Sequence, residues 1–166
     1  MFKGIVLFAA LATGLAPMAS AQLSSADKAF VMKTAQLNNY EIRSGQMAQE
    51  MSTNDAYKSY AQMIVTDHTK AGQELTAAVA SADPSVQLPT DVTAKSQADL
   101  DTLKNAGSDF DMKYRQQMIS SHAMLHSFFQ SYLQRPNDNA GVKQVIESLQ
   151  PVVTKHWNDA KKLPRK

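Results

Sequence analysis

Apolar residues recur every three or four positions through most of the chain after residue 25, a spacing that is typical of amphipathic helices and not of strands. The spacing predicts one helix over residues 26–51 and a second over residues 55–82. Between them, Ser52-Thr53-Asn54 offers three side chains that can cap a helix N-terminus. Asp83-Pro84 should end the second helix, because the residue before a proline avoids the helical conformation.

Two further helices are expected in the second half of the chain. The third should open with Ser108 as its N-cap and close at Arg135-Pro136. The fourth should run from Asn139 to Leu163, with Pro151 inside it. The fold class predicted from these patterns is all-α.

The lengths of the connections predict how the four helices are arranged. The first and second helices are joined by a few residues, as are the third and fourth, so each pair should be an antiparallel hairpin. Roughly 25 residues join the two pairs, and they contain a short helical piece with Leu100 and Leu103. A connection of this length can cross the whole molecule. We therefore expect a ferritin-like four-helix bundle, with a short extra helix in the crossover.

The first 21 residues have the pattern of a secretory signal peptide. Lys3 is followed by an apolar run up to Ala16, and Ala19-Ser20-Ala21 is a small-x-small cleavage sequence. Cleavage after Ala21 would leave residues 22–166 as one domain, with the periplasm as its expected location. No apolar stretch after Ala21 approaches the ~20 residues of a membrane-spanning helix, so we expect no membrane span.

The composition excludes several classes of function. The chain has no cysteine, which excludes disulfides, iron–sulfur clusters, thiolate zinc sites and thiol nucleophiles. The 17 Lys and Arg residues nearly balance the 15 Asp and Glu residues and form no basic block, so we expect no binding to nucleic acid. No nucleophile elbow or glycine-rich phosphate loop occurs, and we assign no catalytic residue.

Four ionisable residues interrupt the apolar stripes that should face the core. Glu41, His68, His122 and His156 lie on the first, second, third and fourth predicted helix, each near its middle. Three imidazoles and one carboxylate are a suitable ligand set for one divalent transition metal: zinc, or iron, copper or nickel. The alternative is a structural polar core in which Glu41 and the histidines satisfy one another without a metal.

A di-iron centre is not expected from this ligand set. Such a centre takes one Glu from each of two helices and a Glu-x-x-His motif from each of the other two. The residues three positions before the histidines are apolar: Val65, Ile119 and Val153. Asp67 neighbours His68 but points about 100° away around the helix, so we expect it at the surface or supporting the ligands from outside.

A second combination of metal-binding side chains lies on the third helix. Met118, His122 and His126 are spaced four residues apart, and thioether and imidazole groups together suit Cu(I). Methionines at helical spacing are more often core residues, which is the competing interpretation of Met118.

Several short segments, spread over nearly all of residues 22–166, form a pattern found in a known family: Phe30-Val31 with Ala35, Tyr40-Glu41-Ile42, Met63 to Lys70, Leu88-Pro89, Asp109 to His122, and Pro151 with His156. In these segments the sequence resembles the domain of unknown function 4142 family, whose exported bacterial members are often labelled outer membrane proteins. The resemblance implies a ferritin-like fold and export, and no particular activity. The family tends to have Asp before the histidine of the third helix, whereas this chain has Ser121.

Two functions of different classes follow from the sequence. The first is an exported protein that binds a metal ion through Glu41 and the three histidines. The second is a non-catalytic envelope or stress-related protein with a structural Glu–His core that acts through protein partners. Enzymatic activity would require an open position on the metal, and the sequence identifies no substrate.

Overall fold

The computed structural model describes residues 22–136 and 138–165, so the predicted signal peptide lies outside the described residues. All regular secondary structure in these residues is helical, which confirms the all-α prediction. The elements are α1 (Ser25–Met51), α2 (Asp55–Ala82), α3 (Ala94–Lys104), the 3₁₀ turn η1 (Gly107–Asp109), α4 (Phe110–Leu133) and α5 (Ala140–Lys162). None of these helices combines the length and the apolar character needed to cross a membrane.

Local side-chain hydrogen bonds explain where most helices begin. The Ser24 hydroxyl accepts from the Asp27 amide and the Asp27 carboxylate accepts from the Ser24 amide, which is a complete capping box at the start of α1. The Asn54 side chain caps α2 and the Asn139 side chain caps α5. The expectation that Ser108 caps the third long helix is wrong. Gly107 adopts the left-handed region at φ 56° and starts η1, so Ser108 lies inside this turn.

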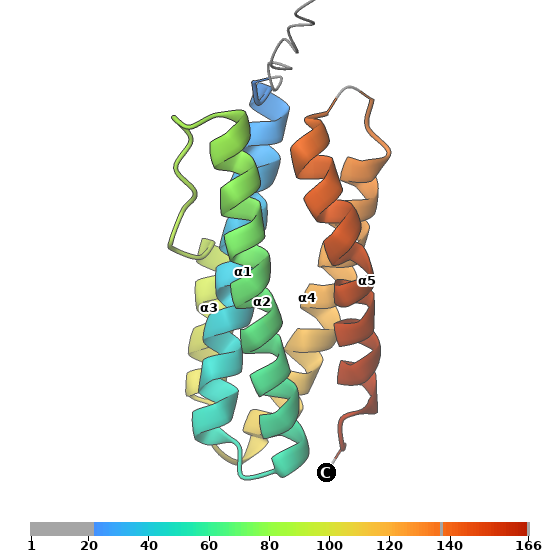
Figure 1. Cartoon of the computed structure of the whole chain (residues 1–166). Helices are drawn as coiled ribbons and strands as arrows, with labels where there is room; N and C mark the ends of the chain where they lie inside the picture. The colour runs from blue at the N-terminus through green and yellow to red at the C-terminus, as the bar shows by residue number, and fades with distance from the viewer. Residues whose placement is uncertain (1–21, 137, 166) are drawn as a thin grey trace, which may run out of the picture.

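The four long helices lie side by side, and their order follows the connections (Figure 1). α1 and α2 form one antiparallel hairpin, and α4 and α5 form the other. Between the hairpins, the chain after α2 runs back along the molecule to α3, which packs against α1 and α4. As a result, α2 and α4 run in the same direction. α2 also packs on α5 and α1 on α4, so all four long helices enclose one core.

Gly45 allows α1 and α2 to approach each other closely near the middle of the hairpin. A Cβ atom at this position would lie 2.9 Å from Val65 Cγ2 and 3.3 Å from the Ala61 carbonyl oxygen. Gly45 is one turn from Glu41 on α1, and Val65 is one turn from His68 on α2. The absence of a side chain at Gly45 therefore brings these two residues toward the same level of the core.

The apolar core is divided into two clusters, one toward each end of the helices. The first cluster includes Tyr40, Tyr57, Tyr60, Ile64, Leu103, Phe110, Tyr114, Met118, Ala160 and Leu163. The second cluster includes Phe30, Val31, Leu37, Leu75, Val79, Leu125, Phe129, Tyr132, Ile146 and Val153. Each long helix contributes to both clusters and therefore passes the border between them.

Candidate metal centre

The border between the two apolar clusters is polar. On α4, for example, Met118 belongs to the first cluster and Leu125 to the second, and His122 lies between them. Each of the other long helices also has an ionisable residue at this level. Glu41, His122 and His156 are 0% exposed and His68 is 5% exposed. The four residues singled out in the sequence therefore all lie in the core, one on each long helix.

Three of these residues, the histidines, form a compact triangle. The ring centroids of His68 and His122 are 5.6 Å apart, and the His156 ring centroid lies 5.4 Å from each of these two. One ring nitrogen from each histidine can be chosen so that all three nitrogens lie within 4.8 Å of one another. Three buried histidines at these distances could hold a metal ion.

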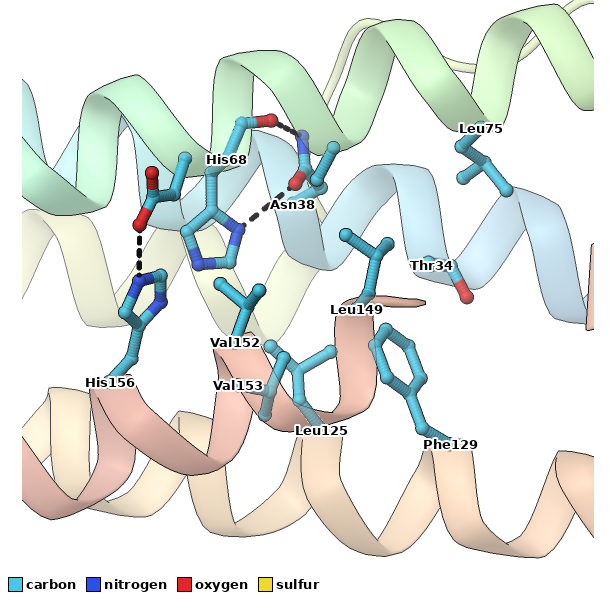
Figure 2. Close-up of a pocket in the computed structure, with 12 residues that line it drawn as sticks. Thr34, Asn38, His68, Leu75, Leu125, Phe129, Leu149, Val152, Val153 and His156 are labelled. Atoms are coloured by element: carbon cyan, nitrogen blue, oxygen red, sulfur yellow. Dashed lines mark hydrogen bonds and ion pairs between the residues drawn. The ribbon is translucent and has the colours of Figure 1, made fainter. Parts of the chain in front are cut away.

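Each histidine uses one ring nitrogen to contact the surrounding protein. His68 Nδ1 lies 3.0 Å from Asn38 Oδ1, and Asn38 Nδ2 donates back to the His68 carbonyl oxygen (Figure 2). His122 Nδ1 lies 2.9 Å from the Met118 carbonyl oxygen. His156 Nε2 lies 2.8 Å from Asp67 Oδ2, also drawn in Figure 2. In each pair the second atom is an acceptor, so the imidazole nitrogen donates and the tautomer of each ring is fixed.

The opposite nitrogen of each ring has no partner. His68 Nε2, His122 Nε2 and His156 Nδ1 are buried and make no hydrogen bond with the described residues. In the tautomers fixed above these nitrogens carry lone pairs and no proton. A buried acceptor without a partner is costly, and three of them within one triangle are what a metal ion would satisfy.

The electrostatics of the triangle favour neutral imidazoles. Burial lowers the pKa of all three histidines. For His122, burial and the neighbouring His156 lower the pKa to about 3, although the hydrogen bond to Met118 acts in the opposite direction. For His156, the Asp67 carboxylate opposes the effect of burial. The imidazoles are therefore unprotonated at neutral pH, which is the form that binds metals.

Glu41 lies beside the triangle and is not part of the group whose ligand atoms converge. Its Oε2 atom is 3.9 Å from His122 Nδ1, the nitrogen that faces Met118. Neither carboxylate oxygen has a hydrogen-bond partner among the described residues. Burial raises the pKa of Glu41 to about 8, and the nearby Ser121 hydroxyl acts in the opposite direction. The Ser121 hydroxyl itself donates to the Met118 carbonyl oxygen. Glu41 therefore carries a proton at neutral pH in the metal-free protein.

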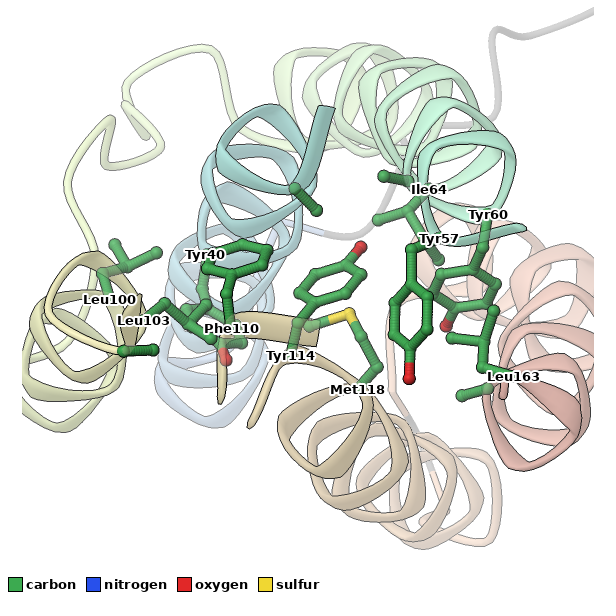
Figure 3. Packing of buried hydrophobic residues seen from close by; sticks show 14 residues of the cluster. Tyr40, Tyr57, Tyr60, Ile64, Leu100, Leu103, Phe110, Tyr114, Met118 and Leu163 are labelled. Carbon is green, nitrogen blue, oxygen red and sulfur yellow. The ribbon is translucent and has the colours of Figure 1, made fainter. Parts of the chain in front are cut away.

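Tyr114 is a second buried group with an unpartnered polar atom at this level. Its hydroxyl makes no hydrogen bond with the described residues, and burial together with the charge of Glu41 raises its pKa well above the usual value. Figure 3 shows Tyr114 packed among Tyr60, Met118 and the other residues of the first cluster. Tyr114 and Glu41 are therefore close enough for the charge of one to affect the ionisation of the other.

The structure adds two residues to the site that the sequence pattern does not assign as ligands. Asn38 lies one turn before Glu41 on α1 and orients His68; its position on the same buried stripe is the only signal in the sequence. Asp67, expected at the surface or in a supporting position, is partly exposed and bonds His156 on α5. Of the Met118–His122–His126 combination, Met118 belongs to the first apolar cluster, His122 to the histidine triangle, and the His126 ring lies 5.7 Å from that of Trp157.

The comparisons with known proteins give one result. A family model described as domain of unknown function (DUF4142) matches residues 12–163. Neither the curated proteins nor the solved structures contain a match to the chain.

Proposed function

The chain belongs to the DUF4142 family, and we propose that this member is an exported protein that binds one divalent transition-metal ion in its core. His68, His122 and His156 supply the nitrogen ligands and Glu41 the carboxylate. The ion is zinc, or another divalent transition metal that accepts imidazole. The observation that carries the proposal is a group of three buried histidines with ligand atoms within 4.8 Å of one another, in which each ring has one nitrogen that donates to the protein and one without a partner.

This pattern is the usual one for histidines that bind metals. A ligating histidine nearly always donates its second N–H to a carboxylate or carbonyl oxygen, which fixes the ring and makes the free nitrogen a stronger ligand. Asp67 performs this role for His156, the Met118 carbonyl for His122 and the Asn38 amide oxygen for His68.

Glu41 balances the charge of the proposed ion. A dication placed among neutral imidazoles would lower the pKa of Glu41 and release its proton. The carboxylate reaches the ion only if its side chain rotates past His122, because its oxygen now lies near the Nδ1 side of that ring. A paired iron centre is not proposed, since Val65, Ile119 and Val153 occupy the positions that would supply its carboxylates.

The proposed function also depends on the arrangement of the helices and on where the protein is located in the cell. We propose a ferritin-like four-helix bundle formed by residues 22–166, with α3 in the crossover, and secretion to the periplasm after cleavage at Ala21. The antiparallel hairpins and the parallel course of α2 and α4 support the first point. The apolar run and the Ala19-Ser20-Ala21 sequence support the second.

The alternative function, a structural Glu–His core in a protein that acts through partners, has one observation in its favour. The pKa shifts leave Glu41 and the histidines uncharged at neutral pH, so the core can exist without an ion. It leaves unexplained why three neighbouring buried rings each have a nitrogen without a hydrogen bond among the described residues.

Zinc binding by protein without a purification tag separates the two functions. We expect the wild-type chain to retain about one equivalent after dialysis, and its thermal midpoint to fall when a chelator removes the ion. His68→Ala should retain none, whereas His126→Ala, which removes the one histidine outside the triangle, should behave like the wild type. A wild-type protein that retains no ion and is insensitive to chelator would contradict metal binding and favour the structural core.

A further inference from the structure

A small cavity opens directly onto two of the three histidines. It lies between α1, α2, α4 and α5, and His68, His156, Asn38 and Asp67 form its polar end. Figure 2 shows the His68 and His156 rings at this end, with Val152 close to the His68 ring. The cavity is therefore adjacent to the place where the proposed ion would sit.

The rest of the cavity wall is apolar. It is formed by Leu75, Leu125, Phe129, Leu149, Val152 and Val153. The Thr34 hydroxyl, which also lines the cavity, donates to the Phe30 carbonyl and offers no free donor. A charged molecule would find no counter-charge or hydrogen-bond donor along this wall and would lose its hydration on entry.

The buried polar atoms without a partner in this lining are two imidazole nitrogens. The Asn38 amide is occupied by His68, and the Asp67 carboxylate by His156. Among the buried side-chain atoms of the lining residues, His68 Nε2 and His156 Nδ1 are those without a partner. A molecule that enters the cavity therefore finds apolar contacts along the wall, and its polar partner would be an ion held on these nitrogens.

The size of the cavity limits what can enter. Its volume is about 20 Å³, somewhat more than the ~10–15 Å³ that a single water molecule requires. A carboxylic acid, a phosphate or a sugar is too large for this space unless the helices separate. A ligand of one or two heavy atoms fits without such a movement.

We infer that the ion keeps one coordination position open toward this cavity, and that with a redox-active ion such as Fe(II) this position reversibly binds a neutral diatomic molecule such as nitric oxide. The inference rests on the proposed function: the three histidines and Glu41 fill the shell of a tetrahedral ion, but they leave a position open on a five- or six-coordinate ion such as Fe(II). Glu41 does not line the cavity, so it approaches the ion from another side and leaves this position free.

The test uses the tag-free protein loaded with Fe(II) under anaerobic conditions, with nitric oxide as the probe. We expect a stoichiometric iron–nitrosyl signal by electron paramagnetic resonance in the wild-type protein. Val152→Phe should fill the cavity and weaken nitric oxide binding roughly tenfold or more, because a close-packed core cannot make room without strain. Val152→Leu is a milder variant that should weaken binding in the same direction if the phenylalanine variant does not fold.

Val145→Phe is the matched control, because Val145 is a half-buried valine on the same helix that does not line this cavity. Iron content is measured for every variant. Equal nitric oxide affinity in the wild type and both Val152 variants, or iron-loaded protein that binds no nitric oxide, would overturn the inference while leaving metal binding intact. Failure of the wild-type protein to retain iron, zinc or any other divalent transition metal would refute the proposed function, and the inference with it.

Discussion

Replacing Glu41 by glutamine should change how the stability of the metal-free protein depends on pH. Burial raises the pKa of this carboxyl from the ordinary 4.5 to about 8. Between these values the unfolded chain has lost the Glu41 proton while the folded protein retains it, so the folded state binds more protons. The free energy of unfolding therefore decreases as the pH rises through this interval.

The displacement of the pKa sets the size of the effect. A change from 4.5 to about 8 corresponds to roughly 5 kcal/mol of lost stability at and above pH 8, acquired at about 1.4 kcal/mol per pH unit. Glutamine has nearly the same shape and cannot ionise, so Glu41→Gln removes this loss. The lowered histidine pKa values destabilise the folded protein at acid pH instead, and they are common to both proteins.

Urea unfolding of chelator-treated protein between pH 5 and pH 8.5 measures the difference. The stability of Glu41→Gln minus that of the wild type should be small at pH 5 and grow to several kcal/mol at pH 8. Glu147→Gln removes one carboxylate from the exposed side of α5 and serves as the control for net charge. Parallel stability profiles for the wild type and Glu41→Gln would refute the assignment of Glu41 as a buried, protonated group.

Two further substitutions test the residues that orient the histidines. Asp67→Ala removes the acceptor for His156 Nε2 and should weaken zinc binding roughly 10–100-fold in a competition titration. The substitution also leaves Nε2 of the fully buried His156 ring without a partner, so the free energy of unfolding should fall by ~1–3 kcal/mol; unchanged zinc affinity would show that this contact does not support a ligand. Asn38→Ala leaves His68 Nδ1 and the His68 carbonyl without partners and should cost ~1–3 kcal/mol in urea unfolding as well as zinc affinity. Asn39→Ala, whose amide binds carbonyls of the segment after α2, should retain the wild-type zinc affinity.

Most of the helix boundaries could be predicted because their signals are local. The Asn54 cap and Asp83-Pro84 determine the ends of α2 through neighbouring residues alone, and the structure has α2 at Asp55–Ala82 as expected. The start of α4 was predicted incorrectly at Ser108. The deciding feature there is the left-handed Gly107, and a glycine can adopt that conformation without being required to.

The convergence of the histidines could be predicted from their positions on the apolar stripes, but their partners could not. Asp67 points away from His68 on its own helix and still reaches His156, because α5 packs against that side of α2. The Met118 carbonyl that holds His122 is a backbone atom, present at every residue, so no side-chain pattern identifies it. Such contacts depend on the rotation of one helix relative to the next, which the sequence of a single helix does not specify.

The central claim is that three imidazoles bind one ion, and X-ray absorption spectroscopy of the zinc-loaded, tag-free protein tests it most directly. We predict nitrogen or oxygen ligands at roughly 2.0–2.1 Å, together with the outer-shell scattering of about three imidazole rings. The ring contribution should fall to about two in His122→Ala if that variant retains zinc. A spectrum with oxygen ligands and no imidazole scattering would contradict the claim, since the ion would then lie outside the histidine triangle.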